Sequence, residues 1–250
     1  MVEGIYNAAA SLSVLEKWQA NISQNLAASN VAGFKKADFA IKSDNQLKTK
    51  YEPDGIPAAR SVSGLPVNMT SINFSAGDMK ATGKPTDLAV EGPGFFKVKD
   101  TDGQFLYTRD GEFQINAENT VVTKNGLPLM ADGSPITLDP DKGPIVVARD
   151  GTISQGDNQL GSLMLYDFKN PRDLTRVEGG FFQAPPGTDE QPVEKIAISQ
   201  GSIEASNVVP MQELVNLIAV ARAYEASQRT MTSQDNMISQ AINSLGTTTA

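Results

Sequence analysis

The sequence predicts an α+β protein in which a mostly antiparallel β centre is flanked by an N-terminal and a C-terminal helix. Apolar residues near both ends recur at alternating steps of four and three, a spacing typical of helices that pair along one stripe. The middle of the chain holds short strand-like runs separated by Asp-Gly pairs, which favour tight hairpins. We therefore expect the two helices to pair in a coiled-coil-like terminal domain.

Residues 1–43 are expected to form the N-terminal helix and turn of this terminal domain. The helix should cover about residues 3–28 and stop before Gly33, which tolerates positive φ. The basic pair Lys35-Lys36 is interpreted as solvated loop charge. The stripe of the helix consists of Ile5, Ala8, Leu12, Leu15, Gln19, Ile22 and Leu26.

Residues 44–83 are expected to be a connector. Prolines and glycines interrupt this polar segment repeatedly, which prevents a long helix. Short strands, such as one from Ser71 to Phe74, are compatible with it.

Residues 84–200 are expected to form a β-rich central domain, since their apolar runs are short and bounded by turn residues. Asp-Gly pairs beginning at Asp102, Asp110, Asp132 and Asp150 predict hairpin turns. The last strand is expected at Ile196–Ile198. The other expected strands are Leu88–Val90, Phe95–Val98, Phe105–Thr108, Thr120–Thr123, Ile145–Val147 and Leu163–Tyr166.

Residues 201–250 are expected to form the C-terminal helix of the terminal domain, running from about Pro210 to Leu245. Proline is tolerated in a first helical turn because no amide is needed there. The polar tail from Gly246 to Ala250 should fray. The stripe of this helix consists of Leu214, Leu217, Ala221, Tyr224, Gln228, Met231, Asp235, Ile238, Ile242 and Leu245.

Polar residues within both stripes favour pairing with a chosen partner. Gln19, Gln228 and Asp235 occupy stripe positions, where a buried polar side chain costs stability but fixes register. Pairing within one chain and pairing between copies remain equally compatible with the spacing.

The composition argues against several functions. The chain has 29 acidic and 21 basic residues, a formal net charge of -8, so no nucleic-acid partner is expected. Cysteine and histidine are absent, which removes disulfides, the usual neutral-pH base and the commonest transition-metal ligands. We therefore expect no catalytic, cofactor-binding or metal-binding residues and no enzyme. No membrane span and no cleavable signal peptide are expected either.

Three glycine-containing segments resemble ligand-binding motifs but fail on their details. Residues 77–85 lack the spacing and hydroxyl of a phosphate loop, residues 92–97 lack the third glycine of a dinucleotide site, and residues 139–143 lack further calcium ligands. Asp110 and Glu112 could act as a carboxylate pair, but we interpret them as solvated residues at a hairpin end.

Several blocks of sequence together resemble the bacterial flagellar rod and hook protein family. The N-terminal block is Asn21–Ala27 followed by Gly33-Phe34-Lys35, and the C-terminal block is Glu204–Val208 followed by Glu213-Leu214 and Ala221–Glu225. In the middle stand Thr82–Val90, Gly92–Phe96 and Tyr107–Phe113. The residues that carry the resemblance most clearly are Asn25, Gly33, Phe34, Gly83, Asp87, Gly94, Phe95, Asn207, Arg222 and Glu225. One departure is Val31-Ala32, where the family usually has threonine with proline or asparagine.

The resemblance implies a structural subunit of the basal-body rod that polymerises helically and transmits torque from motor to hook. It also implies contacts with copies of itself and with neighbouring rod or hook subunits, passage through the flagellar type III export apparatus, and a location in the periplasmic part of the basal body. In the monomer the terminal helices should be mobile and should order on assembly. The expected assembly interface comprises Ile5, Leu12, Leu15, Ile22, Leu26, Leu214, Leu217, Ala221, Tyr224, Met231, Ile238 and Ile242.

The position within the rod and two other functions stay open at this stage. The compact length favours the proximal rod subunit, whereas Phe95-Phe96 and Ala221–Glu225 also suit the distal subunit. A secreted oligomeric adhesin or carbohydrate-binding β-domain would need an aromatic platform, and the only tryptophan, Trp18, lies in the N-terminal helix. A peptidoglycan-cleaving hydrolase would need a paired-acid motif that we do not find.

Overall fold

The computed structural model describes residues 2–43 and 66–246. It is an α+β structure in which the described strand pairs are antiparallel, as the sequence predicts. The chain divides into two compact units. The helix unit comprises Met1–Ala27, Ala37–Ser71 and Val209–Ala250, and the β unit comprises Ala28–Lys36 and Ile72–Val208. Most of the expected connector and the tail from Thr247 lie outside the described residues.

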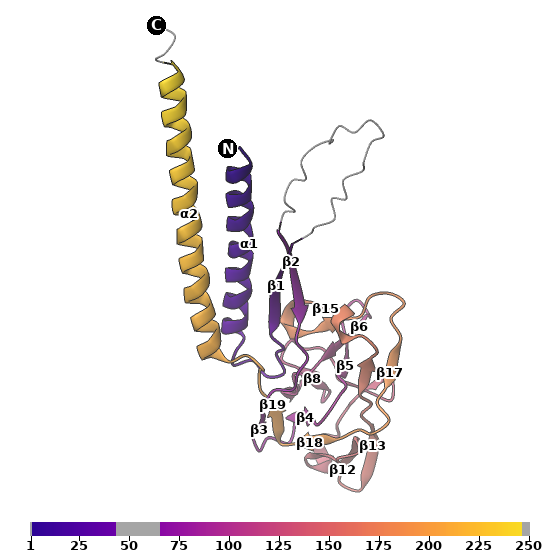
Figure 1. Cartoon of the computed structure of the whole chain (residues 1–250). Helices are drawn as coiled ribbons and strands as arrows, with labels where there is room; N and C mark the ends of the chain where they lie inside the picture. The colour runs from indigo at the N-terminus through magenta and orange to yellow at the C-terminus, as the bar shows by residue number, and fades with distance from the viewer. Residues whose placement is uncertain (1, 44–65, 247–250) are drawn as a thin grey trace, which may run out of the picture. The chain divides into compact units, whose positions relative to one another are not determined.

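The helix unit contains helices α1 (Val2–Ala27) and α2 (Pro210–Gly246), the strand β1 (Ala37–Ser43) and the strand β2 (Pro66–Ile72) except for its last residue. The two helices contact each other and run antiparallel, so the start of α1 and the end of α2 point the same way (Figure 1). α1 also contacts β1, where the rings of Trp18 and Phe39 stack with their centroids 5.9 Å apart. α1 therefore packs on two elements within its own unit.

The β unit consists of short strands joined by turns and by short 3-10 segments at Pro140–Lys142, Pro171–Asp173 and Glu178–Gly180. Its strands are β3 (Met79–Ala81), β4 (Leu88–Val90), β5 (Phe96–Lys99), β6 (Phe105–Thr108), β7 (Phe113–Ile115), β8 (Val121–Thr123), β9 (Met130–Ala131), β10 (Ser134–Pro135), β11 (Ile145–Val147), β12 (Thr152–Gln155), β13 (Asn158–Ser162), β14 (Tyr166–Phe168), β15 (Thr175–Arg176), β16 (Phe182–Gln183), β17 (Glu190–Pro192), β18 (Ile198–Gln200) and β19 (Ser202–Glu204).

The last strands of the β unit return to its first ones. β18 pairs with β4, and β19 pairs with β3. Between these strands lie a four-stranded sheet in the order β15-β16-β6-β5, a three-stranded sheet in the order β11-β12-β13, and smaller pairs. The β unit is therefore closed by residues close to its C-terminal end, after the chain has passed through all the intervening sheets.

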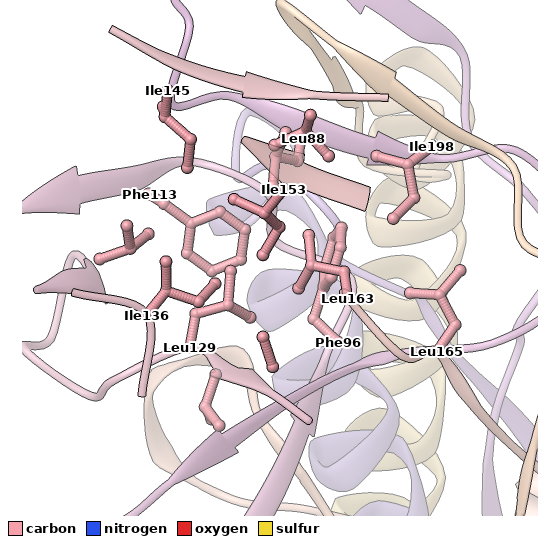
Figure 2. Packing of buried hydrophobic residues seen from close by; sticks show 14 of the residues in the cluster. Leu88, Phe96, Phe113, Leu129, Ile136, Ile145, Ile153, Leu163, Leu165 and Ile198 are labelled. Atoms are coloured by element: carbon pink, nitrogen blue, oxygen red, sulfur yellow. The ribbon is translucent and has the colours of Figure 1, made fainter. Parts of the chain in front are cut away.

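The main core of the β unit gathers aliphatic and aromatic side chains from most of these strands (Figure 2). Phe96, Leu129 and Ile153 are completely buried there. Burial of each such side chain stabilises the fold by about 1.5–3 kcal/mol. A second cluster of Phe95, Tyr107, Phe168, Leu174 and Phe182 packs its rings edge to face.

Three of the four predicted Asp-Gly hairpins are confirmed, and the fourth prediction is wrong. Asp102, Asp132 and Asp150 each stand between two paired strands, followed by a glycine with positive φ. Asp110 instead begins a passage from β6 to β7, which pairs with β8 and not with β6. Gly111 serves close packing there, because its amide carbonyl accepts a hydrogen bond from Leu88 and a Cβ atom would lie 1.6 Å from the Leu88 oxygen.

The predicted strand Leu163–Tyr166 is also wrong over most of its length. Residues 163–165 lie between β13 and β14, and both Leu163 and Leu165 are buried in the main core. The Leu163 amide donates a hydrogen bond to the Gly151 carbonyl, and the Leu165 carbonyl accepts one from the Val193 amide. The apolar run therefore indicates buried side chains, but its backbone does not pair continuously with a neighbouring strand. By contrast β4, β6 and β11 have the predicted bounds. The strand predicted at Ile196–Ile198 corresponds to β18, which lies two residues later, and it is not the last strand because β19 follows it.

Replacing Gly111 by alanine should strongly destabilise the β unit, since the new methyl group would displace the Leu88 backbone. We expect a loss of at least about 3 kcal/mol in the free energy of unfolding by urea. Gly126→Ala is the matched control. Gly126 has positive φ but open space around its Cβ position, so its substitution should cost only about 1–2 kcal/mol. Equal losses in the two variants would contradict close packing at Gly111.

Candidate functional site

The inward face of α2 shares only every second position with the predicted stripe. Leu217, Tyr224, Met231 and Ile238 are half-buried, and the Tyr224 hydroxyl donates a hydrogen bond to Glu16 of α1 at 3.2 Å. Of the other positions shielded from solvent, Val220 is buried, and Asn216, Ala223, Ser227, Gln234 and Ala241 are half-buried. The alternate stripe residues Leu214, Ala221, Gln228, Asp235 and Ile242 are exposed instead. Val220, Ser227, Gln234 and Ala241 each stand one residue before an exposed residue of the predicted stripe.

The stripe on α1 is more fully covered. Ile22 is buried and Leu12, Leu15 and Leu26 are half-buried, whereas the side chain of Ile5 lies outside those described. Val14 is buried although it does not belong to the predicted stripe. Contact of α1 with both α2 and β1 explains the wider covered face.

The first turns of α2 carry a second apolar face that points to solvent. We define the outer apolar face as Met211, Leu214, Val215 and Ile218, whose exposed fractions are 71%, 41%, 54% and 55%. Steps of three and four residues put these side chains on one side of the helix. The inward positions Leu217 and Val220 lie on the other side. Among the described side chains of α2, only Glu213 and Val220 are buried, so this helix leaves most of its surface uncovered.

Asn25 links the end of α1 to the start of β1 within the helix unit. Its side-chain amide donates to the Ala37 carbonyl and its side-chain oxygen accepts from the Ala37 amide, both at 3.0 Å. Asn25 is 2% exposed, so no water can replace these bonds at low cost. This signature residue therefore fixes the path of the chain after the first helix.

Three charged side chains from three different signature blocks meet inside the β unit. We define the Glu204 network as Glu204, Lys35, Arg109 and the amide of Gly77. Lys35 Nζ donates to Glu204 Oε1 at 2.5 Å, and Arg109 Nη1 donates to Glu204 Oε2 at 3.2 Å. The Gly77 amide donates to Glu204 Oε1 at 2.8 Å. Each of the two carboxylate oxygens thus faces a cation.

The interpretation of Lys35 as solvated loop charge is wrong. Lys35 and Glu204 are each 1% exposed, and Arg109 is 7% exposed. Burial lowers the pKa of the Lys35 ammonium, and the hydrogen bond and charge of Glu204 oppose that shift. The sequence could not reveal this pairing because Lys35 and Glu204 are 169 positions apart. The only available signal was that both residues stand in signature blocks.

Asn207 and Gly33 hold the backbone around the Glu204 network. The Asn207 side-chain oxygen accepts from the Lys36 amide at 2.7 Å, and its amide donates to the Asn73 carbonyl at 2.8 Å. The Gly33 amide donates to the Glu204 backbone carbonyl at 2.7 Å. A Cβ atom on Gly33, whose φ is +66°, would lie 2.1 Å from the Arg109 carbonyl carbon. Only glycine fits this approach.

The remaining signature residues divide into buried and exposed groups. Asp87 is buried and accepts a hydrogen bond from Thr82, and the Gly83 amide donates to Gly201. Gly94 packs on Leu165 and Val193, and Phe95 belongs to the second aromatic cluster. Arg222 and Glu225 are exposed on α2, where the structure gives them no role in folding.

A second polar cluster, which the sequence did not indicate, holds β17 on the sheet surface. Lys97 Nζ bonds to both oxygens of Glu190 and lies 4.2 Å and 4.4 Å from the centroids of the Phe105 and Tyr166 rings. The Tyr107 hydroxyl donates to the same carboxylate. Burial and this hydrogen bond raise the pKa of Tyr107.

The sequence features considered for chemistry have structural partners. Lys124 forms ion pairs with both Asp110 and Glu112, and burial raises the pKa of Asp110. Within residues 2–43 and 66–246, no cluster of three or more acidic side chains is arranged to hold a metal ion. No helix in that same part of the chain is long and apolar enough to span a membrane.

Comparison with known proteins supports the resemblance seen in the signature blocks. Residues 89–155 match the model of the flagellar hook protein FlgE/F/G D1 domain, and residues 199–245 match the model of the flagellar basal body rod FlgEFG protein C-terminal region. The flagellar basal-body rod protein FlgF of Caulobacter vibrioides is 36% identical over 90% of both chains. FlgF of Mesorhizobium japonicum is 31% identical over 98% of this chain and 99% of its own.

The chain is similar to FlgG proteins at nearly the same level of sequence identity as to FlgF proteins. The flagellar basal-body rod protein FlgG of Buchnera aphidicola subsp. Schizaphis graminum is 32% identical over 87% of this chain and 90% of its own. An α+β chain with these signature blocks and this extent of similarity belongs to the flagellar basal-body rod protein family. It is therefore a structural rod protein and not an enzyme.

Replacing Asn25 by alanine should destabilise the junction between α1 and β1. The buried amide and carbonyl of Ala37 would both lose their partner, which should cost about 1–3 kcal/mol in the free energy of unfolding. Faster hydrogen exchange at the Ala37 amide would report the loss locally. Gln24→Ala, at an exposed position of the same helix, is the control and should change stability by less than about 0.5 kcal/mol. An unchanged Asn25→Ala variant would refute this role.

Proposed function

We propose that this chain polymerises helically, with copies of itself and with neighbouring rod or hook subunits, to transmit torque from the motor to the hook. The observation that carries this proposal is the outer apolar face of α2. The apolar face of a surface helix normally packs against a partner, yet Met211 and Val215 are more than half exposed in the monomer. In the polymer a neighbouring subunit covers this face.

The proposed interface combines two surfaces with different tasks. α1 and α2 form a coiled-coil-like terminal domain through Leu12, Leu15, Ile22, Leu26, Leu217, Tyr224, Met231 and Ile238, and Ile5 extends this stripe. Leu214, Ala221 and Ile242 project outward, where they contact other subunits. Support comes from the exposed fractions of Leu214 and Ile242, 41% and 64%, and from the incomplete cover of the inward residues.

A helical array also requires that one patch on each copy meets a different patch on the next copy. Such a heterologous contact can propagate without closing on itself. The separate β unit offers further surface for contacts with neighbours, because it is compact and has its own core. Its exposed apolar side chains include Phe105 and Ile115.

The proximal part of the rod is the proposed position. The 36% identity to FlgF of Caulobacter vibrioides exceeds the 32% identity to FlgG of Buchnera aphidicola subsp. Schizaphis graminum. We also propose export through the flagellar type III apparatus to the periplasmic part of the basal body. The family membership supports both proposals.

The experiment that tests assembly introduces a charge into the outer apolar face. Val215→Asp should leave the free energy of unfolding of the monomer within about 0.5 kcal/mol of the unaltered chain, because the side chain is exposed. When it replaces the native gene product, basal bodies should stall within the rod and swimming should be lost. Electron microscopy of purified basal bodies and a motility assay measure the two effects.

Val146→Asp is the matched control for this substitution. Val146 is 50% exposed on β11, compared with 54% for Val215 on α2, so the two changes place the same charge at equally accessible sites. The control should keep wild-type rods and motility. Complete rods carrying Val215→Asp would contradict an interface at the outer apolar face.

A further inference from the structure

The Glu204 network contains two buried cations that share a single carboxylate. Lys35 reaches Glu204 and the Ser75 carbonyl, and Arg109 reaches Glu204 and the Gly92 carbonyl. Asp167 adds a weaker favourable charge near Arg109. Removal of one partner from a buried ion pair is strongly destabilising because it leaves an uncompensated charge. Burial of Lys35 and Arg109 therefore depends on Glu204.

Glu204 comes later in the chain than both of the cations whose burial depends on it. Glu204 follows Lys35 by 169 positions and Arg109 by 95 positions. It also ends β19, which pairs with β3, and its backbone carbonyl accepts the Gly33 amide. A chain that emerges from its N-terminus first thus exposes both cations long before their counter-ion becomes available.

The docking of residues 28–36, which follow α1, also depends on residues late in the chain. Residues 28–36 bond to the rest of the β unit through Gly33, Lys35 and Lys36, and their partners include Glu204 and Asn207. Arg176 additionally donates to the Lys35 carbonyl and stacks on Phe34. Most of these bonds have to wait for residues 204–207.

We propose that Glu204 is a closing latch: residues 28–36 dock and the β unit closes only when this late counter-ion arrives. Before that step the two cations keep the N-terminal part of the β unit open. An open chain suits passage through a narrow channel, but the latch follows from the contacts within the β unit and does not depend on the rod function proposed above.

A double-substitution cycle on the full chain tests the latch. Glu204→Gln keeps the shape of the side chain but leaves both cations uncompensated, so it should shift the unfolding equilibrium about 100-fold or more toward the unfolded state. Lys35→Met keeps the apolar stem and removes one cation. The double variant Lys35→Met with Glu204→Gln should be more stable than Glu204→Gln alone. Additive losses would show that the residues contribute only separate packing, and would overturn the proposal.

The control is Glu190→Gln, which removes a carboxylate from a less enclosed ion pair in the same unit. The Glu190 side chain is 35% exposed, compared with 1% for Glu204, so this variant should shift the unfolding equilibrium by less than about tenfold. An equal effect of Glu190→Gln and Glu204→Gln would also overturn the proposal.

The order of events can be tested with nascent chains held on the ribosome that either end at residue 204 and carry a short spacer, which keeps Glu204 in the exit tunnel, or are full-length and carry a long spacer. With the short spacer the β unit should be sensitive to protease; with the long spacer it should be resistant. Glu204→Gln should stay sensitive with the long spacer, whereas Glu190→Gln should become resistant. Resistance with the short spacer, or resistance of Glu204→Gln, would show that closure does not wait for this carboxylate.

Discussion

The buried carboxylate of Glu204 is the constraint on which the β unit depends. It neutralises Lys35 and Arg109 and accepts the Gly77 amide, while its backbone binds Gly33. These contacts join the segment after α1, the segment before β3, the end of β6 and β19. Such a network adds little net stability compared with an apolar core, but loss of one member is costly. Its main effect is to specify one arrangement of four remote segments.

This arrangement fixes the two connections by which the β unit joins the helix unit. The Lys36 amide, just before β1, donates to the side chain of Asn207, just before α2. The two segments are therefore held beside each other at a bond length of 2.7 Å. The helices themselves leave apolar surface for neighbouring subunits.

Much of the fold was predictable from the sequence because its signals are local. The helices follow from apolar spacing over many residues, and β4, β6 and β11 follow from short apolar runs bounded by turns. The hairpin predicted at Asp110-Gly111 was wrong because Gly111 allows close packing against Leu88 and does not form a hairpin turn. The strand predicted at Leu163–Tyr166 was wrong over residues 163–165 because a buried segment without strand pairing has the same apolar pattern as a buried strand.

The candidate site was only half predictable for two physical reasons. The apolar spacing of α2 could not separate the inward residues from the outward ones. Leu214 and Leu217 are three residues apart and both fit the predicted stripe, yet Leu214 is exposed and Leu217 is half-buried. The Glu204 network depends on contacts between residues 95 and 169 positions apart. Lys35 in a short basic pair looks solvated until its distant partner is known, so only the position of all three charges in signature blocks could have suggested the network.

The central claim is that α2 presents an apolar face that neighbouring subunits cover. Backbone amide hydrogen exchange on the soluble monomer and on purified rods tests it most directly. We predict fast exchange along α1 and α2 in the monomer, and strong protection in the rod that includes Met211 to Ile218. Full protection of both helices in a verified monomer, with no further change at Met211 to Ile218 in the rod, would contradict it.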